Sequence, residues 1–248
     1  MSEQFKIYKL IKISLYIIVI VVIISIIALL ILKYNVEGEK NMPFKLSSII
    51  IISNAQGVDK ELENEYLWNK EIYQNNDIYL NIEKNKNYKD VEIIKSVAIE
   101  NIKIENNPEI GSIEIYRTSN EENKLFSYTD EYKIENKVEY IGALESDLKN
   151  LKISNQGGTI IISTINKTGK VYSSNEEEFE HSGKLLNNIG LSNEEIKYTI
   201  SFDLVIKLES GYSFKANVKL ELPIGDIKKE GTANIEKTDL KNIIFKRE

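Results

Sequence analysis

Residues 200–222 read ISFDLVIKLESGYSFKANVKLEL, in which apolar and polar residues alternate on both sides of the Ser210-Gly211 pair. The apolar residues that share one phase are Ile200, Phe202, Leu204, Ile206, Leu208, Tyr212, Phe214, Ala216, Val218, Leu220 and Leu222. Because successive side chains point to opposite faces of a strand, this period gives each strand one apolar face. A Ser-Gly pair between two such runs is a turn signal. The stretch therefore predicts an antiparallel hairpin with one buried face.

Further strand-like segments extend outward from this hairpin along most of the chain. They are Phe44–Ser53, Ile78–Glu83, Val91–Glu105, Ser112–Arg117, Tyr132–Ile141, Thr159–Ile165, Lys170–Ser173 and Ile235–Phe245. The apolar phase changes between Ile99 and Ile102, which indicates a bulge or a bend. The Asn-Lys-Thr-Gly sequence at residues 166–169 predicts a hairpin turn. Short strands with few helical patterns predict a mainly β fold, an antiparallel β-sandwich-like domain over residues 44–248.

The sequence leaves open whether this β region is one unit or two. Residues 48–53, SIIIIS, are similar to residues 159–163, TIIIS. This similarity would fit a β region built from two similar halves that are divided near residues 119–131. A single sandwich-like unit is the preferred interpretation.

Residues 13–32 form an uncharged apolar run, interrupted by Ser14 and Ser25. A helix of this length spans ~30 Å, which is the thickness of the hydrocarbon core of a bilayer. The run exceeds the ~7–15 apolar residues of a signal peptide, and no small-x-small cleavage site follows it. The sequence therefore predicts a transmembrane helix that acts as an uncleaved signal-anchor. Residues 1–12 form a short basic tail, and residues 33–43 are expected to form a juxtamembrane linker.

The lysine count does not decide the orientation of this helix. The tail contains three lysines, and the twenty residues after the helix also contain three. The tail adds its α-amino charge, and a long C-terminal region is translocated largely regardless of its charge. We therefore expect a cytoplasmic N-terminus and an extracytoplasmic β domain at the cell envelope.

Composition excludes several classes of function. The chain has 248 residues, with 32 basic and 38 acidic side chains and a formal net charge of −6. An acidic balance argues against nucleic acid as a partner, because nucleic-acid binding needs a basic face. With no cysteine and one histidine, disulfides, thiolate metal sites and two-histidine metal motifs are impossible. We expect no metal and no cofactor. An acidic domain is also repelled by anionic headgroups, so we do not expect it to lie flat on the membrane.

One apparent catalytic pair is a chance match. Residues 146–149, SDLK, fit the Ser-x-x-Lys motif of penicillin-binding proteins and serine β-lactamases, and residues 167–169 fit their Lys-Thr-Gly motif. The two lie 18 residues apart, which leaves no room for the helical subdomain that separates them in those enzymes. We therefore expect no enzymatic activity from this pair.

The sequence Ser-Asn-Glu-Glu occurs at residues 119–122, 174–177 and 192–195. A serine followed three residues later by glutamate is typical of a helix capping box, so caps or acidic turns are favoured over calcium loops. His181 follows four nearby glutamates, and a solvated acidic loop is favoured there over a weak cation site or a pH sensor.

Three tyrosines, Tyr66, Tyr73 and Tyr79, lie near the single tryptophan, Trp68, in the sequence. Exposed rings at these positions would form a platform for a sugar or a peptide. The competing interpretation places them in the core. They are the candidate binding residues of the sequence.

These observations predict a single-pass membrane protein whose β domain acts by binding and not by catalysis. Besides the lipid bilayer, its expected partners are another envelope or membrane protein or a wall polymer. One alternative is an accessory subunit of a membrane assembly, in which the helix itself is the interface. A second alternative is a carboxylate-dependent cell-wall hydrolase, because two distant acids leave no sequence signature.

Overall fold

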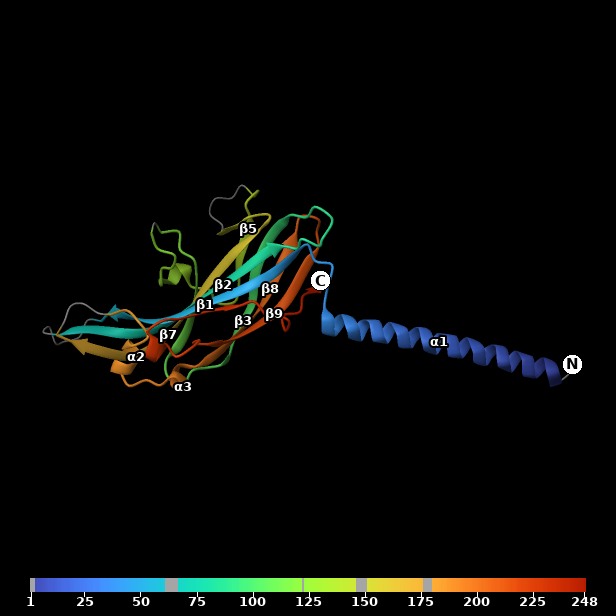
Figure 1. The fold of residues 1–248 in the computed structure, drawn as a ribbon, viewed down its shortest axis with the longest axis horizontal. Helices are drawn as coiled ribbons and strands as arrows, with labels where there is room; N and C mark the ends of the chain where they lie inside the picture. Colours follow the sequence, from blue (N-terminus) through green and yellow to red (C-terminus); the bar gives the residue numbers. More distant parts are fainter. Residues whose placement is uncertain (1–2, 61–66, 122, 146–150, 176–179) are drawn as a thin grey trace.

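The computed structural model describes residues 3–60, 67–121, 123–145, 151–175 and 180–248 (Figure 1). It is 47% strand and 20% helix, with an N-terminal apolar helix followed by two sheets that pack as a sandwich-like domain. The predicted fold class is therefore confirmed.

The first sheet, sheet A, has the strand order β10-β1-β2-β7-β4, and all its neighbours are antiparallel. Its strands are β1 (Phe44–Asp59), β2 (Trp68–Lys84), β4 (Ser112–Arg117), β7 (Gly157–Ser174) and β10 (Ala233–Lys237). The ends of β2 and β7 reach the side of the domain farthest from the helix (Figure 1). Strands β1, β2 and β7 have 16, 17 and 18 residues, so they provide the long axis of the domain.

The second sheet, sheet B, has the order β11-β9-β8-β3-β5-β6. Its strands are β3 (Ile94–Asn106), β5 (Val138–Gly142), β6 (Leu151–Ile153), β8 (Tyr198–Leu208), β9 (Ser213–Leu222) and β11 (Lys246–Arg247). Only the β5–β6 pair among these is parallel. Strands β8 and β9 pair from Tyr198↔Leu222 to Lys207↔Ser213, which confirms the hairpin predicted at residues 200–222.

The core lies between the two sheets and uses the apolar phase of that hairpin. Its members include residues with no measurable exposure, among them Ile49, Ile51, Ile78, Leu80, Ile160, Ile162, Ile200, Phe202, Leu204, Ile206 and Val218. Removing such side chains from water is the main favourable term in folding. Both sheets combine strands from before and after residues 119–131, so neither half of the chain forms a sandwich by itself.

The turn predicted at residues 166–169 is wrong. Strand β7 runs straight through it, and the pairing with β2 shifts between Tyr73↔Lys167 and Glu71↔Val171. Gly169 has a φ of +68°, and the Thr168 hydroxyl donates to the Ile72 carbonyl at 2.5 Å. Residues that favour a turn are also found in β-bulges, because both often need a residue with positive φ, which glycine adopts readily.

Other strand boundaries also differ from the prediction, because β1 and β2 are longer than the predicted Phe44–Ser53 and Ile78–Glu83. Residues 132–137 precede β5 without joining it, and residues 130–132 form a short 3-10 turn, η1 (Asp130–Tyr132). The last predicted strand ends at Lys237, and residues 238–245 continue without strand pairing. The predicted irregularity near Ile99 is confirmed, because β3 shifts its register against β8 between Glu100 and Lys103.

Three short helices connect the strands: α2 (Leu185–Asn188), α3 (Asn193–Ile196) and α4 (Ile227–Glu230). Ser192 caps α3 in the predicted capping box, since its oxygen accepts from the Glu195 amide while the Glu195 carboxylate accepts from the Ser192 amide. At residues 119–121 the same sequence forms a turn, in which the Ser119 oxygen accepts from the Glu121 amide. The third copy lies partly outside the described residues.

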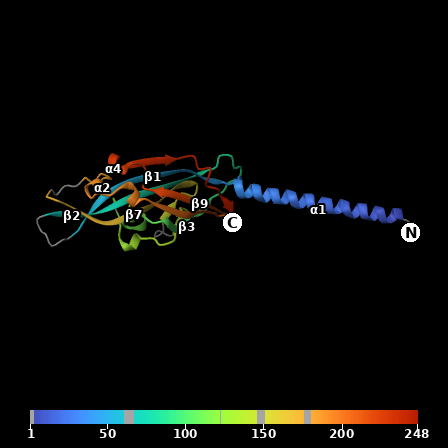
Figure 2. The ribbon, with the colours of Figure 1, turned by 90° about the horizontal axis from the view of Figure 1, so that it is seen from below.

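Helix α1 (Glu3–Glu37) is longer than the predicted span of residues 13–32 and projects from the domain as a single rod (Figures 1 and 2). Residues 33–37 were expected to form the linker, but nothing in Lys-Tyr-Asn-Val-Glu stops a helix. Gly38 ends it with a φ of +70°, and its amide donates to the Tyr34 carbonyl. The connector is therefore reduced to residues 38–43. By length and composition α1 can cross a membrane, and none of its apolar window is buried against the domain.

Candidate binding surface

The structure separates the four aromatic residues singled out from the sequence. Trp68 begins β2 at the end of the domain far from α1 and is 44% exposed. Tyr73 and Tyr79 lie further along β2, half-buried on the face of sheet A that points away from the core. Six residues of strand place them about 20 Å apart. Tyr66 lies outside the described residues. A ligand role for the three described rings stays a prediction.

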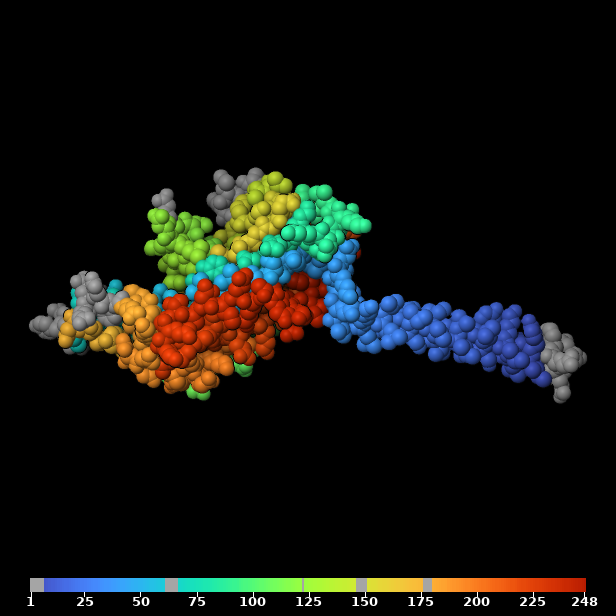
Figure 3. All heavy atoms as spheres, in the orientation of Figure 1, coloured from blue at the N-terminus to red at the C-terminus, as the bar shows by residue number. Residues whose placement is uncertain are grey.

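Residues 118–121 and 123–134 cover part of this outer face and stand out from the domain as a light green lobe (Figure 3). Tyr132 of this segment forms a second, smaller apolar cluster with Tyr116 and Ile165 of the sheet, and Tyr73 and Tyr128 pack against that cluster. The Tyr128 ring meets Tyr116 edge-on at 5.3 Å between centroids. The segment is therefore anchored to the outer face by aromatic packing.

Asp77 lies on the same outer face, on β2, opposite Ser163 of β7. The Ser163 hydroxyl donates to Asp77 Oδ1 at 2.7 Å. Burial raises the pKa of Asp77, although the hydrogen bond from Ser163 opposes this. Burial, together with the nearby Asp77 carboxylate, raises the pKa of Tyr128 to about 12. The protein therefore holds a half-buried carboxyl group beside Ser163 and Tyr128.

Asn75 adds a second acceptor to this face. Its side chain is 6% exposed, and its Oδ1 atom has no hydrogen-bond partner within the described part of the chain. A buried oxygen without a donor is costly, so it favours a group that supplies one. We define Asn75, Asp77, Tyr79, Ser163 and Tyr128 as the outer-face site. Its acceptors suit hydroxyl, amide or amine donors.

Sequence reasoning missed four of these residues: Asn75, Asp77, Ser163 and Tyr128. The available signal was the period of two from Tyr73 to Tyr79, which places Asn75 and Asp77 on the face of the two tyrosines. The pattern could be used only if the strand was predicted to begin before Tyr73, and the predicted strand was Ile78–Glu83. Ser163 and Tyr128 depend on strand register and on the fold of the covering segment.

An ion network borders the outer-face site. The Glu114 carboxylate accepts hydrogen bonds from Lys133 at 2.8 Å, from the Tyr116 hydroxyl at 2.5 Å, and pairs with Lys167 at 2.5 Å. Burial alone would raise the pKa of Glu114, but these donors outweigh it and lower the pKa to about 2. Lys167, from the apparent Lys-Thr-Gly motif, thus has a structural partner. Residues 146–149, the other half of that motif, lie outside the described residues.

Replacing Glu114 with glutamine should destabilise the protein at neutral pH and not at pH 2. A carboxyl group whose folded pKa lies below its unfolded pKa of 4.5 stabilises the folded state above pH 4.5, and this contribution is lost as the pH falls towards 2. Since solvent reaches both lysines, we expect a loss of about 1–2 kcal/mol at pH 7. Urea denaturation at both pH values measures it, with the exposed Glu83→Gln as the control. An equal loss at the two pH values would contradict this assignment.

His181 accepts a structural hydrogen bond from a neighbouring strand. Its Nδ1 atom accepts from the Gly57 amide of β1 at 3.2 Å. Among the described residues, no group of three or more histidine or acidic side chains is placed to hold a metal ion. The acidic stretch just before His181 lies partly outside them.

No known protein family, curated protein or solved structure matches this chain. Its role is therefore inferred from its own residues: a long apolar helix, a β-sandwich, and an acceptor-rich site on the outer face of sheet A.

Proposed function

We propose that the chain is a single-pass membrane protein that presents a non-enzymatic binding domain on the extracytoplasmic side of the cell envelope. The observation that carries the proposal is α1, a 35-residue helix whose apolar side chains are exposed all along residues 13–32. Such a surface is unfavourable in water, and a bilayer is the environment in which it is stable.

The junction between helix and sandwich supports this proposal. The Arg247 amide donates to the Tyr34 hydroxyl at 2.9 Å, and the Lys246 ammonium donates to Asn35 Oδ1 at 3.1 Å. The Glu39 amide donates to the Phe245 carbonyl at 2.7 Å. The last turn of α1 is therefore held by the C-terminal segment, so the domain is carried close to the membrane in a defined orientation.

The outer-face site is the proposed ligand surface. Its buried acceptors favour a partner rich in hydroxyl, amide or amine donors, which fits a wall polymer or an exposed protein segment. Ser163 and Asp77 resemble two members of a hydrolase triad, but the only histidine of the chain is bonded to Gly57 on β1. The pair lacks the histidine base that would activate the serine, which supports binding without catalysis.

Cysteine labelling tests the orientation, because the chain has no native cysteine. Lys103→Cys on sheet B should react with a membrane-impermeant maleimide in intact cells. Lys9→Cys in the N-terminal tail should react only after the cells are permeabilised. The reverse pattern would overturn the proposed orientation. Labelling of both positions in intact cells would contradict a membrane-spanning α1.

A further inference from the structure

Three tyrosines and an arginine gather where α1 leaves the sandwich. The Arg247 amide donates to the Tyr34 hydroxyl at 2.9 Å, and the Arg247 guanidinium lies over the Tyr212 ring, 3.6 Å from its centroid. Desolvation is the main cause of the raised pKa of Tyr88, and Tyr212 and Arg247 lie close enough to act on it as well. We define Tyr34, Tyr88, Tyr212 and Arg247 as the junction cluster. Its members come from α1, the β2–β3 loop, the β8–β9 turn and β11.

The depth of the junction cluster follows from the helix. Tyr34 is the second residue after Leu32, where the apolar run ends, and two residues of helix rise ~3 Å. The headgroup layer is ~5–8 Å thick on each side of the hydrocarbon core. Because Arg247 is held by the Tyr34 hydroxyl and contacts the Tyr212 ring, the cluster lies at headgroup depth if α1 spans a bilayer as proposed above.

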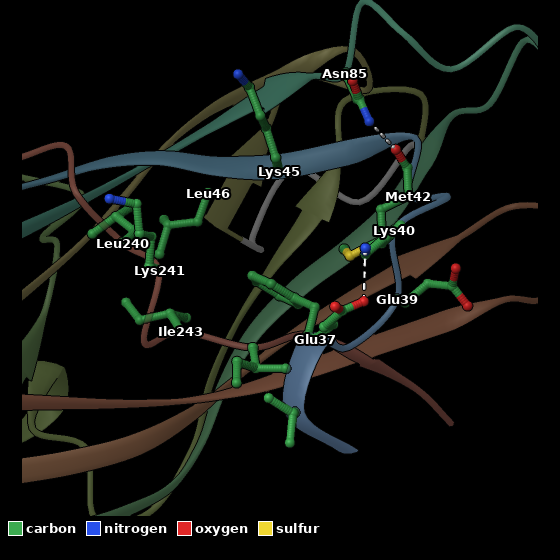
Figure 4. A pocket seen from close by; sticks show the side chains of 13 residues that line it. Glu37, Glu39, Lys40, Met42, Lys45, Leu46, Asn85, Leu240, Lys241 and Ile243 are labelled. Carbon is green, nitrogen blue, oxygen red and sulfur yellow. Dashed lines mark hydrogen bonds and ion pairs between the residues drawn. The ribbon is translucent and has the colours of Figure 1, made fainter. Parts of the chain in front are cut away.

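The β2–β3 loop is tied to this junction at both of its ends. At its start the Asn85 side chain donates to the Met42 carbonyl at 2.8 Å, as drawn in Figure 4, and the Asn85 amide donates to the Pro43 carbonyl at 2.7 Å. At its end the Ile93 carbonyl accepts from the Glu209 amide of the β8–β9 turn at 3.0 Å. Figures 1 and 2 show the loop at the end of the domain from which α1 leaves.

The side chains exposed at this end suit a lipid surface. Tyr212 is 44% exposed, and Val91 of the β2–β3 loop is 80% exposed. Arg247 is exposed, and its guanidinium has no carboxylate partner in the part of the chain that the structure describes. Tyrosine is enriched at membrane–water interfaces, and arginine forms paired hydrogen bonds with phosphate. Headgroups would therefore supply the anion that Arg247 lacks and would cover the two exposed apolar groups.

The charge of the domain is distributed in the same sense. We call the strand ends and loops next to α1 the helix-side end, which consists of residues 33–45, 83–95, 207–215 and 246–248. It carries 11 basic and seven acidic side chains, a net charge of +4, even with Asp90 and Glu92 beside Val91. The rest of the chain after residue 45 carries 18 basic and 30 acidic side chains, a net charge of −12. Anionic headgroups attract the first part and repel the second, which favours an upright domain.

We propose that the helix-side end is a second membrane contact. The junction cluster and Val91 lie in the headgroup layer of the leaflet from which α1 emerges, and the sandwich stands upright on that layer. The proposal rests on the membrane anchoring proposed above. Asp77 of the outer-face site lies seven residues before the end of β2, so an upright domain holds that site ~23 Å beyond the headgroups.

Fluorescence quenching of the full-length protein in nanodiscs tests the proposal. The discs contain dioleoylphosphatidylcholine and dioleoylphosphatidylglycerol, with a nitroxide on a fraction of the headgroups. Each variant has one introduced cysteine that carries a fluorescent maleimide. We expect quenching of the label at Val91→Cys. The label at Lys103→Cys should not be quenched, because this exposed position lies nine residues beyond Ile94 on β3, ~30 Å from the loop. The label at Lys33→Cys, next to the apolar run, should be quenched and reports insertion of α1.

Arg247→Ala in the Val91→Cys background tests the part played by the junction cluster. We expect it to lower the quenching, as should discs of dioleoylphosphatidylcholine alone, because each change removes one side of the attraction between arginine and anionic lipid. Arg117→Ala is the matched control. The Arg117 guanidinium also lies over a tyrosine ring, 4.8 Å from the centroid of Tyr132, but on β4, away from the helix-side end. It should leave the quenching unchanged.

A quenched label at Lys33→Cys with an unquenched label at Val91→Cys would overturn the upright contact and leave the anchor intact. Equal quenching at Val91→Cys and Lys103→Cys would mean that the domain lies flat, which also overturns the proposal. Unchanged quenching in the Arg247→Ala variant would contradict the role of the junction cluster. An unquenched label at Lys33→Cys would instead contradict the membrane anchor itself.

Discussion

Replacing Phe202 with alanine should lower the free energy of unfolding by about 3–5 kcal/mol. Phe202 lies on β8, pairs with Val218 of β9, and has 0% exposure in the main core. Alanine would leave a cavity between the two sheets, since strands fixed on both sides of β8 cannot close in on it. A loss of this size is a large part of the stability of an ordinary domain.

Denaturation of the full-length protein in detergent, followed by far-UV circular dichroism, measures this loss. Tyr212→Ala is the matched control, because it also removes an aromatic ring but at a position that is 44% exposed. The Tyr212 ring contacts the Arg247 guanidinium at 3.6 Å, so its removal should cost under about 1 kcal/mol. Similar losses for the two variants would mean that Phe202 is not in the core.

The hairpin of residues 200–222 could be predicted because both of its signals are local. Its apolar residues keep a single phase on each side of the turn, and Gly211 adopts a φ of +91° there. Burial and backbone conformation both follow from those residues, whatever lies around them. The capping box at Ser192 was predictable for the same reason.

Residues 166–169 show where local signals fail. The sequence Asn-Lys-Thr-Gly favours a turn and a bulge equally. Which of the two forms depends on whether a neighbouring strand continues past these residues. Strand β2 continues past this point as far as Trp68, so β7 keeps a partner and stays extended. The prediction of a strand as far as Phe245 was wrong for a related reason. Ile243 and Phe245 are apolar because they pack at the helix junction, and not because they lie in a sheet.

The outer-face site could be predicted only in part. Of its residues only Tyr79 stood out, as an aromatic, whereas Asp77 is an ordinary polar position on the outward face of a strand. Its environment comes from Ser163, which is 86 residues away, and from Tyr128 of the covering segment. Neither the strand register nor the path of that segment is encoded in a short pattern.

The end of α1 illustrates a different limit. Hydropathy marks where an apolar surface stops, which here is Leu32, but a helix ends only where the backbone is interrupted. Lys33 to Glu37 contain three polar or charged residues yet remain helical, and Gly38 provides the interruption. These residues contact the C-terminal segment, so residues 33–37 of the predicted linker are part of the helix and of its junction with the domain.

Replacing Val21 and Ile24 together with arginine should move the protein from the membrane to the aqueous fraction. Both residues lie at the middle of the apolar run, where each arginine costs ~2.5–3.5 kcal/mol of insertion free energy. Together the two substitutions oppose insertion by ~5–7 kcal/mol. The sandwich should still fold, because the apolar window of α1 is not buried against it. Carbonate extraction followed by ultracentrifugation measures the distribution.

The matched control replaces the same two residues with leucine, which keeps the helix apolar while changing its surface. If α1 is an anchor, the leucine variant should stay in the membrane and keep the binding of the β domain unchanged. A leucine variant that inserts normally but loses its partner would favour an accessory subunit that assembles through the helix. An arginine variant that still pellets with membranes after carbonate treatment would contradict the anchor.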